Sequence, residues 1–164
     1  LTFIDTPGAY PGLEAEKHGQ GEAIARNLME MSGIKTPIIT VVIGEGGSGG
    51  ALGLGVADKV YMLENSVYSV ISPEGCAAIL YKDPNRVEEA ANNLKLSSHS
   101  LLKIGLIDGI IDEALGGAHR GPEDTAFNLK KVDLEAVEEL EKLPVDELVE
   151  KRYEKFRQMG VFNR

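Results

Sequence analysis

One stretch of the chain, GEGGSGGALGLG, combines residues that could do chemistry in more than one way. Gly44, Gly46 and Gly49 have the G-x-G-x-x-G spacing of a dinucleotide-binding turn, where glycines let a pyrophosphate approach the backbone. Gly46, Ser48 and Gly50 have the G-x-S-x-G spacing of a hydrolase nucleophile elbow. A third interpretation needs no side chain, because consecutive glycines that open a helix expose backbone N–H groups to a developing oxyanion.

The first two interpretations find little support elsewhere in the chain. A dinucleotide site uses an acidic residue about 20 positions on, where Glu64 lies, but the intervening helix would be short and rich in glycine, which disfavours helices. A hydrolase triad would need His119 with Asp108 or Asp112 beside Ser48, and nothing in the sequence places them there. A P-loop is excluded because no Lys-Ser or Lys-Thr pair follows the glycines. We therefore favour the backbone interpretation, with glycines for close packing alone as the alternative.

Strand and helix patterns alternate around this stretch, which predicts an α/β fold. The β-branched run at 37–43 directly precedes the glycines and is typical of a strand buried on both faces. Further strands are expected at 1–5, 59–64, 67–71 and 106–111. Helices are expected at 14–32, from Ser72-Pro73-Glu74 onward, at 85–94, at 97–104 and over about 40 residues at the C-terminal end.

Composition limits the class of protein. A chain of 164 residues suits one domain, and its formal net charge of −9 argues against binding a nucleic acid backbone or an anionic membrane surface. Cys76 is the single cysteine, so an internal disulfide and a cysteine-rich zinc site are excluded, and a reducing compartment is expected. No apolar run approaches the roughly 18 residues of a membrane span, and no signal peptide is visible. The chain opens on LTFID without an initiator Met, so we expect it to be part of a longer protein.

The C-terminal region is acidic, with nine acidic and four basic residues between Asp133 and Lys155. We interpret this excess as the solvated face of amphipathic helices. The opposite face is an apolar stripe, which must dock on the domain or on a partner chain, and docking on the domain is favoured. The stripe consists of Val145, Leu148, Val149, Tyr153 and Phe156.

Three motifs occur in order along the chain, DTPGAYPG, GEGGSGGALG and SVISPEGCA, and ALGGAHR follows them. With these motifs the chain resembles the carboxyltransferase α subunits of bacterial and plastid acetyl-CoA carboxylase, from residue 1 to about residue 160. The resemblance implies the crotonase (ClpP/crotonase-like) fold, a spiral of ββα units, followed by C-terminal amphipathic helices. It divides the chain into an N-terminally incomplete carboxyltransferase core at 1–121 and a helical extension at 122–164. Complete subunits of the family are longer at the N-terminus, so we expect this chain to be their C-terminal part.

The resemblance also implies an activity and partners. The family transfers a carboxyl group from carboxybiotin, carried on a biotin carboxyl carrier protein, to acetyl-CoA, which gives malonyl-CoA for fatty acid biosynthesis. The α subunit works with a β subunit that bears a zinc ribbon, in an α2β2 heterotetramer, and with biotin carboxylase in an ATP-dependent cytoplasmic complex. This chain has no C-x-x-C motif, which agrees with its being the α partner, and no metal is expected in it.

Site residues follow from the resemblance position by position. The peptide N–H groups of Gly49 and Gly50 are expected to hold the ureido oxygen of biotin, where negative charge develops, so Ser48 need not be catalytic. Contacts to the biotin rings are expected from Gly8, Ala9, Tyr10 and Pro11, with Gly46 and Gly47 as secondary contacts. Simple loop packing is the alternative for Tyr10. For the whole chain, another crotonase-fold acyl-CoA enzyme, a hydratase or decarboxylase, or a non-catalytic scaffold for the β subunit stays open.

Overall fold

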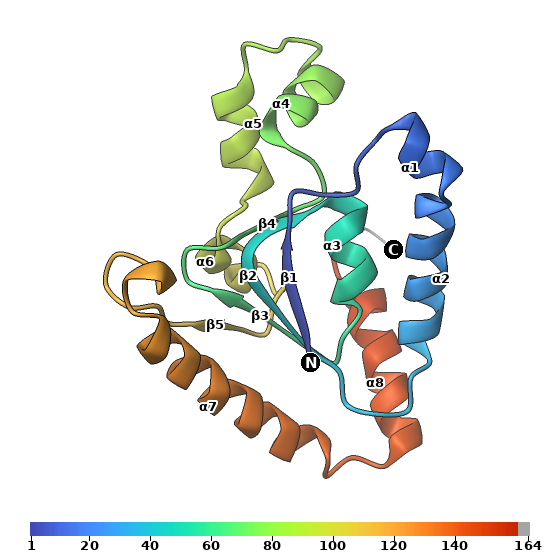
Figure 1. The fold of residues 1–164 in the computed structure, drawn as a ribbon, viewed down its shortest axis with the longest axis vertical. Coiled ribbons are helices and arrows are strands. Elements are labelled where there is room, and N and C mark those ends of the chain that lie inside the picture. The colour runs from blue at the N-terminus through green and yellow to red at the C-terminus, as the bar shows by residue number, and fades with distance from the viewer. Residues whose placement is uncertain (161–164) are drawn as a thin grey trace.

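The computed structural model describes residues 1–160, so the last four residues of the expected C-terminal extension lie outside the described part. Five parallel strands form one sheet: β1 (Thr2–Thr6), β2 (Ile39–Gly47), β3 (Lys59–Leu63), β4 (Val67–Ser69) and β5 (Gly109–Ile111). Figure 1 shows this sheet in the middle of the molecule with helices around it. The predicted α/β class is therefore confirmed.

The helices of the N-terminal half are α1 (Leu13–Lys17), α2 (Gln20–Ser32) and α3 (Ser48–Gly55). The middle of the chain forms α4 (Pro73–Cys76), the π-helical turn η1 (Ala77–Tyr81), α5 (Val87–Leu94) and α6 (Ser98–Lys103). The C-terminal part forms the 3₁₀ turn η2 (Ala118–Arg120), α7 (Pro122–Leu140) and α8 (Val145–Gln158). None of these helices is long and apolar enough to cross a membrane within the described residues.

Strand β2 is the centre of the sheet. Its first half pairs with β3 and its second half, from Glu45 to Gly47, pairs with β4, while β1 runs along its other edge. The strand therefore continues four residues past the expected end at Ile43, into the glycine stretch, because β4 supplies a partner there. Since β1 and β2 are parallel, the chain leaves both strands at the same edge of the sheet.

One face of the sheet is covered by α2 and α3. Ile4 and Val42 from the strands and Ala51 from α3 belong to a cluster of buried side chains there. Partly buried Phe156 of α8 packs against the same cluster. Leu148 of α8 is buried as well, so two positions of the predicted apolar stripe dock on the domain, whereas Val145 and Tyr153 stay exposed.

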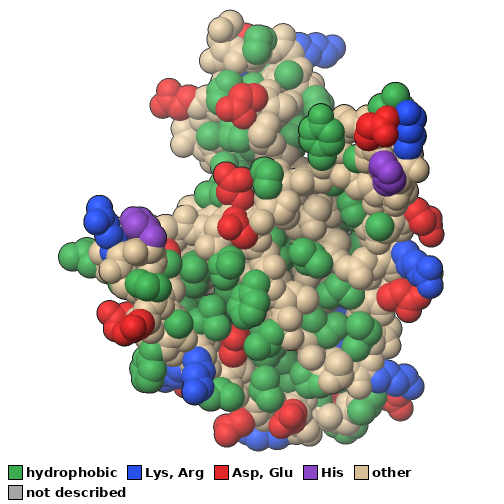
Figure 2. Space-filling model, viewed as in Figure 1, with side chains coloured by type: hydrophobic (Ala, Val, Ile, Leu, Met, Phe, Trp, Pro, Cys, Tyr) green, Lys and Arg blue, Asp and Glu red, His purple; other side chains and the backbone are tan. Residues whose placement is uncertain are grey.

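Helix α7 covers part of the opposite face. Val41, Leu63 and Ile111 are buried there with partly buried side chains of α7 packed against them. Neighbouring Phe3 and Ile43 are 48% and 41% exposed, so this face is only partly covered. Figure 2 shows hydrophobic side chains gathered in the middle of the face seen in that view.

A small lobe of α4, η1 and α5 stands away from the sheet at the top of Figure 1. It has its own buried cluster of Cys76, Ala77 and Ala90. Ser72 caps its first helix as predicted, because the Ser72 Oγ accepts the Gly75 N–H at 3.1 Å.

Two helix predictions were wrong in detail. The helix expected at 14–32 is two helices, because Gly19 adopts a left-handed conformation (φ +78°) between α1 and α2. The C-terminal helix of about 40 residues is also two, α7 and α8, with a break between Leu140 and Val145. The acidic face is not wholly solvated either, since Asp133 on α7 is 6% exposed.

Candidate functional site

The loop that leaves β1 and the junction of β2 with α3 touch backbone to backbone. A Cβ atom on Gly47 would lie 2.1 Å from the carbonyl oxygen of Pro7, and one on Gly50 would lie 2.9 Å from the Ala9 nitrogen. Gly8 itself has φ +133°, a conformation that side chains rarely adopt. Glycine is therefore required at these positions by close approach, and the structure brings together Gly8, Ala9, Gly47 and Gly50 of the predicted site.

The two ends of α3 differ in the hydrogen bonds that their backbone groups make. Near its C-terminal end, the carbonyl oxygen of Leu54 accepts hydrogen bonds from the hydroxyls of Thr2 (3.0 Å) and Thr40 (3.2 Å), and that of Gly53 accepts one from the Asn27 amide. At its N-terminal end the N-cap residue, Gly47, has no side chain to cap the helix. The first N–H groups of a helix have no intrahelical acceptor, and the helix dipole is positive there. This end is thus left able to bind an anionic oxygen.

A cavity of about 290 Å³ opens beside the same junction. It lies toward β4 and α4 and is lined by Pro7, Glu45, Gly46, Gly47, Ser48, Val67, Ser69, Ile71, Ser72, Pro73 and Leu96. Sequence reasoning used SVISPEG as a strand, a helix start and a family motif, but placed no site residue in it. The structure places this segment at the site through the register of β4, in which Tyr68 pairs with Gly46 and Ser69 with Gly47.

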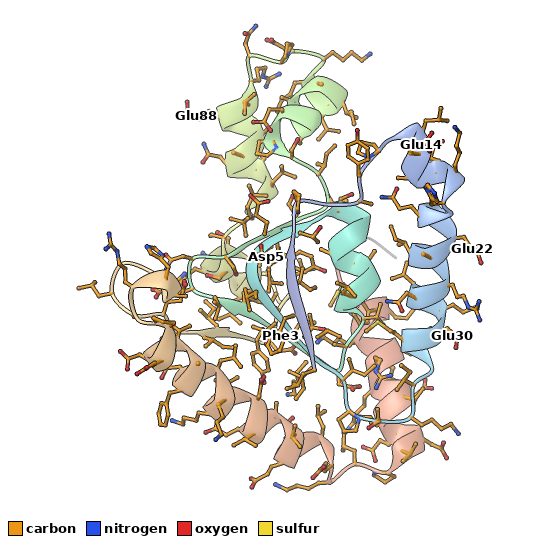
Figure 3. All side chains as sticks on the ribbon, in the orientation of Figure 1. Phe3, Asp5, Glu14, Glu22, Glu30 and Glu88 are labelled. Atoms are coloured by element: carbon orange, nitrogen blue, oxygen red, sulfur yellow. The ribbon has the colours of Figure 1, made fainter. Side chains whose placement is uncertain are left out.

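Two carboxylates, those of Asp5 and Glu45, lie near the ends of β1 and β2. The Asp5 carboxylate accepts the Glu45 N–H at 3.0 Å, and Glu45 is the one charged side chain among the residues that line the cavity. Figure 3 labels Asp5 and Phe3 along β1. On the other side, the partly buried Tyr68 packs near the end of α3, and burial raises the pKa of its phenol.

The contact between the loop after β1 and α3 does not include Tyr10, Gly46 or Gly49, although Gly46 lines the adjoining cavity. Tyr10 is 73% exposed with its ring against Gly12, and a Cβ atom on Gly49 would meet only Ile24 of α2, at 3.9 Å. Gly46 is buried, and a Cβ atom there would lie 2.9 Å from the Tyr68 ring. Ligand contacts of these residues stay predictions.

The dinucleotide and hydrolase interpretations find no partners in space. Glu64 and His119 line a separate cavity, next to Asn65 and Glu113, and no histidine lines the cavity at Ser48. Within residues 1–160 no group of three or more His, Cys, Asp or Glu side chains is placed to hold a metal ion. What the arrangement offers is backbone N–H chemistry at the start of α3.

Comparison with known proteins gives consistent matches. The chain is 95% identical, over its whole length, to the acetyl-coenzyme A carboxylase carboxyl transferase subunit alpha of Fusobacterium nucleatum, of which it covers 52%. It thus spans about half the length of the curated relatives it matches, and its place within that length stays a prediction.

Solved structures agree on the fold. The transcarboxylase 12S structure with bound methylmalonyl-coenzyme A is 27% identical, with a TM-score of 0.61 over 67% of this chain and 23% of that one. A Pseudomonas malonate decarboxylase hetero-tetramer in complex with coenzyme A is 18% identical, with a TM-score of 0.74 over 92% of this chain and 59% of that one, a likeness of fold alone. The crotonase fold predicted from the sequence motifs is confirmed. The family model described as acetyl co-enzyme A carboxylase carboxyltransferase-like matches residues 1–160, and the chain belongs to that family.

Proposed function

We propose that this chain is the biotin-receiving part of a carboxyltransferase α subunit, which transfers a carboxyl group from carboxybiotin to acetyl-CoA and gives malonyl-CoA. The observation that carries the proposal is the uncapped first turn of α3, pressed against the Gly8–Ala9 backbone. The 95% identity to a protein named as that subunit supports the choice of reaction among the chemistries that such a turn could serve.

The N–H groups of Gly49 and Gly50 are the proposed donors to the ureido oxygen. Both belong to the first turn of α3, where the helix supplies no acceptor and the dipole favours negative charge. A donor preorganised toward developing charge contributes about 3 kcal/mol to the transition state. This role needs no side chain, which agrees with glycine at positions 49 and 50.

The Gly8–Ala9 segment would border the bound ring. Carboxybiotin brings an activated carboxyl group to the site, so the residues of this chain need only bind it, orient it and receive charge through their N–H groups. A Cβ atom on Gly50 would lie 2.9 Å from the Ala9 nitrogen, so glycine keeps the first turn of α3 against this segment, and the proposed ring would lie beside that contact. Tyr10, Pro11 and the two glycines at 46 and 47 are proposed as outer contacts.

Partners complete the proposed enzyme. A β subunit with a zinc ribbon would bind acetyl-CoA, a biotin carboxyl carrier protein would deliver the cofactor, and biotin carboxylase would recharge it with ATP. The assembly proposed is an α2β2 heterotetramer in the cytoplasm that serves fatty acid biosynthesis. The net charge of −9 agrees with CoA phosphates being bound mainly by the partner.

The test is reverse carboxyltransfer, the malonyl-CoA-dependent carboxylation of free biocytin, by the full-length subunit assembled with its β partner. Gly50→Ala adds a Cβ atom that would lie 2.9 Å from both the Ala9 nitrogen and the Gly8 carbonyl carbon, so the loop and the donor must move apart. We expect the rate to fall by about 10²-fold or more. Gly53→Ala is the matched control, because its Cβ atom meets Ile24 at an ordinary 3.6 Å in the same helix.

Each outcome decides one point. A large loss in Gly50→Ala with a normal rate in Gly53→Ala supports both the activity and the site. Equal rates in both variants keep the activity but reject the site at α3. No carboxylation by a well-formed wild-type complex rejects the reaction, and favours a scaffold for the β subunit or a different acyl-CoA reaction.

A further inference from the structure

Three residues other than glycine have a positive φ within the described part of the chain: Ser48 (+51°), Lys82 (+53°) and Lys95 (+54°). The two lysines are the C-cap residues of η1 and α5, where a left-handed residue is the ordinary way to end a helix. Ser48 instead begins a helix, directly after β2. Its backbone strain therefore has no explanation in helix termination.

Glycine would remove this strain, and the surrounding sequence is almost entirely glycine. Gly46, Gly47, Gly49 and Gly50 flank Ser48 on both sides, and a fifth glycine at the strained position would adopt φ +51° freely. The side chain at this position is thus kept against a conformational preference for glycine. A strained residue in a cleft is a reason to look for a function.

The Ser48 side chain is placed to meet a ligand. It is exposed, it lines the cavity of about 290 Å³, and its hydroxyl has no hydrogen-bond partner among residues 1–160. Its neighbours in the next two positions are the proposed ureido donors, Gly49 and Gly50. A serine hydroxyl can both donate and accept a hydrogen bond, so it suits a carboxylate or CO₂ oxygen. The N–H donors beside it favour the same kind of oxygen.

We propose that the Ser48 hydroxyl donates a hydrogen bond to the carboxyl group being transferred, while the N–H groups of Gly49 and Gly50 hold the ureido oxygen. The inference rests on the proposed function. In carboxybiotin the carboxyl group is bonded to the ring nitrogen next to the ureido carbon, so the two acceptors are chemical neighbours. Adjacent donors at the start of α3 match adjacent acceptors, and Ser48 sets the orientation of the group without forming a bond to it.

Binding of two probes separates this role from a structural one. The full-length subunit assembled with its β partner would be titrated by calorimetry with biocytin, which lacks the N1 carboxyl group, and with N1-methoxycarbonyl-biotin, a stable analogue that carries it as an ester. Ser48→Ala keeps the Cβ atom and removes the hydroxyl. We expect about five- to tenfold weaker binding of the N1-methoxycarbonyl probe, as for one lost hydrogen bond, and unchanged biocytin binding within about twofold.

Ser48→Gly and Lys95→Gly complete the set. Both relieve a positive φ, so both should unfold at a denaturant concentration equal to or above that of the wild type. Ser48→Gly should show the same selective loss of N1-methoxycarbonyl-biotin as Ser48→Ala, and Lys95→Gly should bind both probes normally. Unchanged binding of the N1-methoxycarbonyl probe by Ser48→Ala, or an equal loss for both probes, overturns the inference. Wild-type protein that binds neither probe overturns the biotin site of the proposed function and this inference with it.

Discussion

Helices α3 and α8 both dock on the parallel sheet, yet they are built from opposite kinds of residue. Helix α3 (SGGALGLG) has no charged residue and four glycines, and it packs by bringing backbone close to backbone. Helix α8 (VDELVEKRYEKFRQ) has eight charged residues, and it docks through Leu148, Phe156 and the buried Arg152. The absence of side chains leaves the start of α3 open for a ligand, whereas the side chains of α8 serve attachment.

Arg152 shows how completely α8 is attached. All five guanidinium N–H groups have acceptors: two go to the Asp58 carboxylate at 2.7 and 2.9 Å, and three go to the carbonyl oxygens of Met31, Ile34 and Thr36 at 2.8–3.0 Å. Asp58 also accepts the Ile38 N–H at 2.7 Å. One side chain therefore joins α8 to the end of α2 and to the turn that leads into β2.

The largest effect is expected from breaking this attachment. Arg152→Met leaves the Asp58 carboxylate buried without its cation, and loss of one partner of a buried pair costs about 3–5 kcal/mol. Denaturant unfolding of the full-length protein would measure the loss. Lys151→Met is the matched control on the same helix, because among residues 1–160 Lys151 pairs only with exposed Glu147 and such pairs contribute at most about 1 kcal/mol. Equal stabilities of the two variants would contradict the role given to Arg152.

A smaller effect is expected from adding a side chain where backbone approaches backbone. Gly47→Ala places a Cβ atom 2.1 Å from the Pro7 carbonyl oxygen and 2.8 Å from the Gly8 nitrogen, so the loop after β1 must shift. Overpacking of this kind costs about 1–3 kcal/mol. Gly53→Ala meets Ile24 at an ordinary 3.6 Å or more and should gain up to about 1 kcal/mol in helix propensity.

Urea unfolding of these two alanine variants would compare them directly. Opposite signs of the change in unfolding free energy support close approach as the reason for glycine at position 47. The same sign in both would show that α3 tolerates side chains along its whole length.

The smallest effect concerns Asp133, a buried carboxylate on α7. Asp133 of α7 is 6% exposed, and one of its carboxylate oxygens has no hydrogen-bond partner among the described residues. Burial raises the pKa of this carboxyl above its ordinary value of 3.8. Because the folded state binds the proton more readily, stability is greatest below the unfolded pKa and falls as the pH rises through the folded pKa.

Replacing this carboxyl should therefore increase the stability of the fold at neutral pH. Asp133→Asn removes the buried charge and should stabilise the fold by about 1 kcal/mol at pH 7, with the difference fading as the pH falls toward 4. Unfolding midpoints at pH 7 and pH 4.5 would measure it. Exposed Glu138→Asn on the same helix is the control and should show no such gain. A gain in Asp133→Asn that persists at low pH would mean that packing, rather than ionisation, is responsible.

Much of the fold followed from local patterns. The β-branched run before the glycines became the central strand, Ser72-Pro73 began a helix, and Leu148 and Phe156 of the apolar stripe docked on the domain. These features depend on residues close in sequence, or on apolar periodicity that any suitable surface can satisfy. The break at Gly19 was missed although glycine is a local signal for a left-handed residue, whereas the burial of Asp133 was missed because it depends on what packs against the helix.

The sequence by itself determined that glycines follow a buried strand and begin a helix, and its ordered motifs determined the family. Only the tertiary structure decided which atoms each glycine faces. Gly50 faces the Ala9 nitrogen and Gly47 faces Pro7, while Gly53 faces a side chain of α2. It also placed Ser69 and Ser72 beside Ser48, through the pairing of β4 with the end of β2. The physical reason is that these contacts join segments 20 to 40 residues apart, and strand register, which no local pattern encodes, sets which atoms meet.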